Sequence, residues 1–164
     1  DIICYLTDDS SYKCNKFTVL NKVFQDPWVM VTYEETEFYN VIIEDGKIKK
    51  GEKYFVNIDI GKAIPYSADR LHQSNFIDHI ALSHRSSCLK LISDKYSYLW
   101  DENKTFWIHA DWIFWKRLSE FWDFTPVDSC LSEKWRHSKC VQNFCNSFGL
   151  DVKVSRDKLM EEYL

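Results

Sequence analysis

The first sixty residues carry short apolar runs separated by polar residues, a pattern typical of β-strands. Apolar, β-branched and aromatic side chains concentrate at positions 2–6, 17–24, 29–33, 38–43 and 54–60. Between the last two runs, Asp45-Gly46 supplies a residue pair favoured in hairpin turns that need positive φ. The pattern predicts an antiparallel β meander over about residues 2–60, with an acidic turn at Glu34-Glu35.

After Pro65 the apolar positions recur at helical spacing. Ser67 is a helix-capping residue type, Pro126 is expected to stop a helix, and Gly149 suits a position just past a helix end. We predict helices over about residues 67–83, 106–123, 130–148 and 156–163. Strands followed by helices indicate an α+β domain in which the helices pack on one face of an antiparallel sheet.

Two segments of this second half have alternative interpretations. Residues 88–92 are short and apolar enough to form a buried strand. Residues 96–108 fit a hairpin with a polar loop, in which case the helix predicted over residues 106–123 begins near Ala110 instead of Phe106. Periodicity alone does not choose between these alternatives.

The segment 106–124, FWIHADWIFWKRLSEFWDF, is apolar around nearly its whole circumference when drawn as a helix. It contains four of the seven tryptophans, and such a helix must be covered on most sides. Trp112, Trp115 and Trp122 are therefore expected either in the core or against a second protein chain, including a second copy of this one.

Length and composition restrict the class of protein. With 164 residues, the chain has the length of one globular domain, residues 1–164, and its 16% aromatic content predicts a core of large flat side chains. The net charge of −4 argues against nucleic acid as the main partner. No apolar run reaches the ~18–20 residues of a membrane span, so no membrane partner is expected.

The cysteine count bears on localisation. Six cysteines permit three disulfides, which favours a secreted protein slightly over a cytoplasmic one, with buried free thiols as the alternative. Cys130, His137, Cys140 and Cys145 offer zinc-ligand atoms, but no C-x2-C pair is present. We therefore expect no metal and no cofactor.

Candidate catalytic residues are His79, His84 and Cys88, which lie close in sequence near several serines. A thiol or hydroxyl nucleophile needs a histidine base within hydrogen-bond reach, and proximity in sequence does not ensure that contact. No known catalytic motif surrounds these residues.

The function favoured by these observations is non-catalytic capture or neutralisation of a protein partner, as by an inhibitor, an immunity-type protein or an effector. Tryptophan is enriched at binding hot spots, and the acidic residues Glu34, Glu35 and Glu37 would suit a basic partner. One alternative is a small hydrolase with a Cys/Ser-His site around residues 79–88. Another is a small-ligand carrier with an aromatic pocket. The sequence does not specify the oligomeric state.

Overall fold

The computed structural model describes residues 1–45, 47–55, 62–100 and 109–136, and it has the predicted α+β class. The elements follow the order β1 (Ile2–Cys4), β2 (Ser10–Tyr12), α1 (Lys16–Val23), β3 (Val31–Glu44), β4 (Lys47–Phe55), α2 (Ala68–Gln73), β5 (Leu82–Arg85), α3 (Cys88–Tyr96), α4 (Ala110–Ser119) and β6 (Phe124–Arg136). Strands β1 to β4 come early and three of the four described helices come late, as an α+β order requires.

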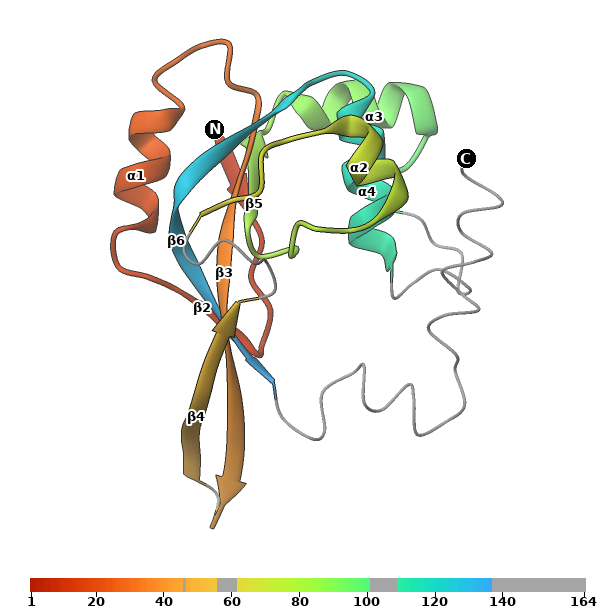
Figure 1. Cartoon of the computed structure of the whole chain (residues 1–164). Coiled ribbons are helices and arrows are strands. Elements are labelled where there is room, and N and C mark those ends of the chain that lie inside the picture. The colour runs from red at the N-terminus through yellow and green to blue at the C-terminus, as the bar shows by residue number, and fades with distance from the viewer. Residues whose placement is uncertain (46, 56–61, 101–108, 137–164) are drawn as a thin grey trace, which may run out of the picture.

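The six described strands form one sheet in the order β1-β5-β3-β6-β2, with β4 added to β3. Strand β3 is central because its first residues pair with β5, its later residues pair with β4, and the stretch from Val31 to Asn40 pairs with β6. The β3–β6 pair is parallel and the other four pairs are antiparallel. In Figure 1, the β3/β4 hairpin extends away from the rest of the sheet.

This arrangement confirms the hairpin and corrects the meander. Glu44 pairs with Lys47, and Asp45 has a positive φ of 51°, as the Asp45-Gly46 signal predicts. A simple meander is wrong, since β1 and β2 lie at opposite edges of the sheet and β3 pairs in parallel with the distant β6. The predicted acidic turn at Glu34-Glu35 is also wrong, because β3 continues through both residues.

Residues 17–24, predicted as a strand, belong mainly to helix α1. Leu20 and Phe24, spaced by one helical turn, are buried, whereas Phe17 is exposed. An apolar pattern of this length fits either period, and the tertiary contacts of one helical face favour the helix. For the same reason, residues 88–92 lie in helix α3, where Cys88 and Ile92 form the buried pair.

Two predicted helices are replaced wholly or partly by other structure. The helix expected over residues 67–83 is limited to α2, and Leu82 begins strand β5. Residues 130–136 of the helix expected over 130–148 belong to β6, where they pair with β3 and β2. Residues 137–148 and the helix predicted over residues 156–163 lie outside the described part of the chain.

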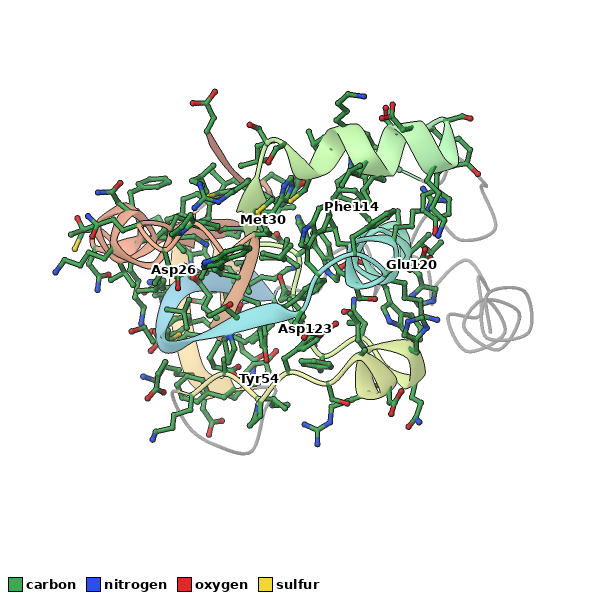
Figure 2. The ribbon with its side chains drawn as sticks, turned by 90° about the horizontal axis from the view of Figure 1, so that it is seen from above. Asp26, Met30, Tyr54, Phe114, Glu120 and Asp123 are labelled. Atoms are coloured by element: carbon green, nitrogen blue, oxygen red, sulfur yellow. The ribbon has the colours of Figure 1, made fainter. Side chains whose placement is uncertain are left out.

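The tryptophan-rich segment forms α4 from Ala110, the later of the two predicted starts, and residues 106–108 lie outside the described part. Helix α4 lies between α3 and α2, with Phe114 turned toward the centre (Figure 2). Trp112 is 1% exposed and Trp115 is fully buried, so the core alternative applies to both. Among the described helices, none combines the length and the hydropathy that crossing a bilayer would require.

Candidate functional site

A small polar cleft of about 150 Å³ lies beside the N-terminal turn of α4. Its lining combines four carboxylates, a guanidinium, an amide and two aromatic rings, and consists of Glu34, Glu35, Thr36, Phe38, Asn75, Phe76, Ile77, Asp78, Asp111 and Arg136. This concentration of charged groups with apolar walls is characteristic of binding and active sites.

Four separate elements bring these side chains together. Strand β3 supplies residues 34–36 and Phe38, and the segment joining α2 to β5 supplies residues 75–78. Asp111 lies in the first turn of α4, and Arg136 is the last residue of β6. The cleft is thus formed where the central strand meets the helical side of the fold.

Asp111 is the carboxylic acid of the cleft with the most perturbed proton affinity. Burial is the main cause that raises its pKa from 3.8 to about 6, and the nearby charge of Asp78 adds to this rise. The backbone N–H of Trp112 donates to Asp111 Oδ1 at 2.7 Å, and Asn75 Nδ2 donates to Oδ2 at 3.3 Å. These hydrogen bonds, together with the Lys134 charge, oppose the effect of burial without cancelling it.

Asp78 lines the cleft and also forms an ion pair with Lys134, which does not line it. Lys134 Nζ lies 3.3 Å from Asp78 Oδ2 in a largely buried ion pair. Burial is the main cause that lowers the pKa of the neighbouring His79, with a further lowering by Lys134 that Asp78 and Asp9 oppose. His79 therefore contributes to the electrostatics near the cleft, although it is not one of the lining residues.

Glu34 is nearly fully buried at one side of the cleft and is held by a lysine from helix α1. Lys16 Nζ donates to Glu34 Oε1 at 3.0 Å, and the Ser132 hydroxyl donates to the same oxygen. Burial raises the pKa of Glu34, and the Lys16 charge acts in the opposite direction. The second carboxylate oxygen, Oε2, is buried and has no hydrogen-bond partner among the described residues.

Among the described residues, no hydrogen bond joins the predicted catalytic residues His79, His84 and Cys88 to one another. His84 is buried with its Nε2 2.6 Å from the Tyr5 hydroxyl and its Nδ1 2.8 Å from the Arg85 carbonyl oxygen. Cys88 is also buried, its thiol faces the Met30 carbonyl, and burial raises its pKa to about 11. A thiol with this pKa is almost entirely protonated at neutral pH, so its chemistry gives no support to a thiol nucleophile.

The predicted metal ligands can be followed only in part. Of Cys130, His137, Cys140 and Cys145, only Cys130 lies in the described part of the chain, and burial raises its pKa to about 11. Within residues 1–45, 47–55, 62–100 and 109–136, no three His, Cys, Asp or Glu side chains converge as a metal site would require. The four cysteines in these ranges are free thiols.

The predicted binding residues lie mostly inside the molecule. Trp112 and Trp115 are core residues, and Trp122 packs against the core while partly exposed. Glu37 is buried, and its Oε1 forms ion pairs with Lys13 Nζ at 2.9 Å and with Lys53 Nζ at 3.3 Å. These residues do not form one accessible surface, and the two glutamates at positions 34 and 35 are among the residues that line the cleft.

The sequence interpretation did not select Asp111, Asn75 or Asp78. One signal was available for Asp111, namely a carboxylate placed among tryptophans in the first turn of a helix that is otherwise apolar. No comparable signal identifies Asn75 or Asp78, since both lie in a polar connection whose position depends on the tertiary fold.

The chain is similar to Protein CgeD of Bacillus subtilis (strain 168), with 30% identity over 145 residues. The matched segment makes up 87% of this chain and 31% of CgeD, so the chain spans about a third of the length of that relative. No protein-family model matches the sequence.

Proposed function

We propose that this chain contributes an acid–base active site in which Asp111 removes a proton from a hydroxyl group or a water molecule bound in the polar cleft. The observation that carries the proposal is the pKa of Asp111, raised by burial to about 6, on a side chain that lines the cleft. Catalytic bases are most effective when their pKa lies near the working pH. At neutral pH, Asp111 would be mostly ionised and able to accept a proton.

The surroundings of Asp111 suit the role of a base. Asn75 and the Trp112 N–H orient both carboxylate oxygens, so the group has a defined direction. Its position in the first turn of α4 favours the ionised form, because helix N-termini stabilise negative charge. Asp78 lies close enough to affect its proton affinity and would disfavour two negative charges side by side.

The lining also favours a class of substrate. Carboxylate oxygens accept hydrogen bonds, so a lining with four carboxylic acids suits a molecule that carries hydroxyl or amino groups. Phe38 and Phe76 offer apolar surfaces beside these acceptors. A volume of about 150 Å³ holds only a small molecule or the reacting end of a larger one. The reaction would then be a hydrolysis or a group transfer in which the deprotonated oxygen is the nucleophile.

The test begins with the acid itself, because the substrate is unidentified. Titration of the aspartate carboxyl carbons by ¹³C NMR should find Asp111 with a midpoint near 6. A panel of small sugars, polyols and amino alcohols should then shift backbone amide signals of residues 34–36 and 75–78. Compounds that bind would be screened as nucleophiles with activated donors, where Asp111→Asn should lose activity and the exposed control Asp94→Asn should retain it.

Two results would overturn the acid–base proposal. One is an Asp111 titration midpoint near the ordinary value of 3.8, which would remove the property on which the proposal rests. The other is turnover of a cleft-binding compound that is unchanged in Asp111→Asn. Either result would mean that the cleft is not an acid–base active site.

Protein binding remains a second candidate function, supported by a different surface. Trp28 is 90% exposed and Phe17 is 60% exposed. The loop that carries Trp28 is held by Arg85, whose guanidinium donates to the carbonyl oxygens of Phe24, Val29 and Asp26. A large aromatic side chain presented on an anchored loop is a typical binding hot spot.

A photo-crosslinking residue placed at position 28 tests this second function. A specific partner should crosslink in cells at position 28 and should be absent from the same experiment at Leu91, an exposed apolar control on α3. The partner should also be lost when Phe17→Ser is added to the position-28 protein. Equal crosslinking at positions 28 and 91 would contradict a specific surface.

A further inference from the structure

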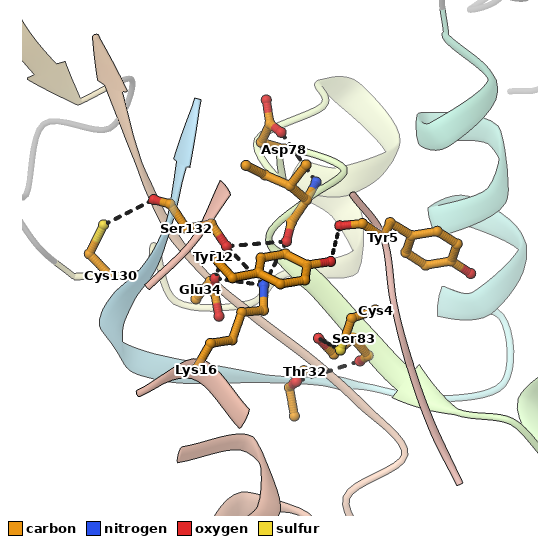
Figure 3. Close-up of polar contacts among 11 residues, drawn as sticks. Cys4, Tyr5, Tyr12, Lys16, Thr32, Glu34, Asp78, Ser83, Cys130 and Ser132 are labelled. Carbon is orange, nitrogen blue, oxygen red and sulfur yellow. Dashed lines mark hydrogen bonds and ion pairs between the residues drawn. The ribbon is translucent and has the colours of Figure 1, made fainter. Parts of the chain in front are cut away.

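The side chain of Lys16 is fully buried and makes three hydrogen bonds at the side of the cleft. Its Nζ donates to Glu34 Oε1 at 3.0 Å, to the Ile80 carbonyl oxygen at 2.8 Å and to Ser132 Oγ at 2.8 Å (Figure 3). The Tyr12 ring lies 4.2 Å from the same nitrogen. An ammonium group has three donors, and all three are used here.

The three acceptors belong to three separate parts of the fold. Glu34 is in the central strand β3 and lines the cleft, and Ser132 is in the neighbouring strand β6. Ile80 is in the connection between α2 and β5, two residues after the cleft residue Asp78. Lys16 itself begins helix α1. One buried cation therefore joins a helix, two strands and the connection that carries Asn75 and Asp78.

Hydrogen bonds continue from Ile80 toward the cleft. The Ile80 N–H donates to Asp78 Oδ1 at 3.3 Å, and the Ala81 N–H donates to the Asp78 carbonyl oxygen at 2.9 Å. The Ile77 N–H donates to Asn75 Oδ1 at 3.4 Å, which leaves Asn75 Nδ2 directed at Asp111. The position of the Ile80 carbonyl thus affects both residues that contact or polarise Asp111.

We propose that Lys16 is a positioning residue, which fixes residues 75–81 against β3 and β6 and so sets the place of Asn75 and Asp78 around Asp111. The inference deepens the proposed acid–base function and rests on it for its catalytic meaning. Lys16 does not line the cleft, so it acts on Asp111 through the connection and not by direct contact. A buried ammonium is suited to this task, because leaving any of its polar acceptors without a partner is costly.

Two substitutions of Lys16 and one control separate positioning from general stability. Lys16→Met removes the three hydrogen bonds and keeps an unbranched side chain that is one atom shorter. Lys16→Arg keeps the charge and the donors with a different geometry. Lys22→Met, in the last turn of the same helix and exposed, is the matched control.

Amide hydrogen exchange measures the first expected effect. In Lys16→Met, the amides of residues 77–81 should exchange about tenfold faster or more, while amides of α3 and α4 keep their protection. Lys16→Arg should show a smaller increase confined to the same residues, and Lys22→Met should show none. Faster exchange spread evenly over the whole chain would overturn the positioning role, because it would reflect global stability alone.

The titration of Asp111 gives the second readout. A loosened connection admits water to the cleft and relieves the burial of Asp111, so its NMR midpoint should fall from about 6 toward 3.8 in Lys16→Met. An unchanged midpoint would contradict the inference. Should Lys16→Met fail to fold, Ser132→Ala takes its place, since it removes one acceptor and leaves the Lys16–Glu34 pair.

The two proposals fail in different ways. If Asp111 of the unmodified protein titrates near 3.8, the acid–base function is wrong, and the exchange of residues 77–81 still decides whether Lys16 positions the connection. If Asp111 titrates near 6 and Lys16→Met changes neither the exchange nor the midpoint, the role of Lys16 is wrong and the proposed base stands.

Discussion

Replacing Asp111 with asparagine should stabilise the fold at neutral pH, although the change removes the proposed base. The folded protein raises the pKa of Asp111 from 3.8 to about 6, so the ionised form is disfavoured by folding. A rise of roughly two pKa units corresponds to about 3 kcal/mol when the group is ionised in both states. Asparagine is close in shape to the protonated acid and carries no charge, so it avoids this cost.

The sign of the effect determines its pH dependence. Since the folded pKa lies above the unfolded one, the folded state binds the proton more tightly. The unmodified protein therefore loses stability from this group as the pH rises from about 4 to about 6, and the loss is constant above that. Asp111→Asn should match the unmodified protein within about 1 kcal/mol in acid and exceed it by up to about 3 kcal/mol near pH 8.

Urea unfolding at several values between about pH 4 and about pH 8 measures this difference. Asp94→Asn is the control, because Asp94 is exposed and its ion pair with Lys90, at 2.6 Å, lies on the surface. Its effect should be small at every pH. A difference between Asp111→Asn and the unmodified protein that is the same at both ends of the range would refute the assignment of a raised pKa to Asp111.

Three further predictions concern groups outside the cleft. Lys116 Nζ is buried without a hydrogen-bond partner among the described residues, and burial lowers its pKa, so Lys116→Met should stabilise the protein by about 1–2 kcal/mol in urea unfolding at neutral pH. Ser97 follows α3 with a φ of 64°, a conformation that glycine adopts without strain. Ser97→Gly should therefore increase the free energy of unfolding by up to about 1 kcal/mol, which a higher melting temperature would show. With iodoacetamide near neutral pH, exposed Cys14 should be labelled at least about tenfold faster than buried Cys88, as read by peptide mass spectrometry, and equal rates would contradict the burial of Cys88.

Local signals predicted the parts of the fold that depend on neighbouring residues. The Asp45-Gly46 pair located the β3/β4 hairpin because positive φ is a local requirement. The tryptophan-rich segment indicated a buried helix because its apolar positions surround the helix axis. In both cases the physical cause lies within a few residues of the signal.

Pairing between distant segments accounts for the errors. Leu131 and Trp135 are spaced as on one face of a helix, yet both lie in strand β6. Strand β6 forms because its backbone pairs with β3, which lies about 95 positions earlier, as in the pair Glu35 and Cys130. Glu34 likewise resembles a turn residue by composition, whereas Lys16 and the parallel partner strand keep it within β3. The residue pattern of a strand does not specify which distant segment it pairs with.

The candidate site could not be predicted for the same reason. Asp111 becomes a distinctive acid through burial in the folded chain, with Asn75 and Asp78, more than thirty positions earlier, beside it. The histidines and Cys88 were predicted as catalytic from their residue types alone. A site requires side chains that converge in space, and the irregular connection between α2 and β5 provides that convergence for the cleft.

A comparison of the Lys16–Glu34 pair with Asp111 separates the framework from the proposed chemistry. Lys16 and Glu34 bury opposite charges in direct contact, so each offsets much of the cost of the other and together they connect parts of the fold. Within the described part of the chain, Asp111 forms no ion pair, and its carboxylate accepts hydrogen bonds from an amide and a backbone N–H. A fold stabilised by charge pairs has no need of such an acid, and its ionisation near neutral pH costs stability. Proton transfer at the cleft is the function that would use this destabilised carboxylate, and the measured pH dependence of Asp111→Asn tests the physical premise of that argument before any substrate is known.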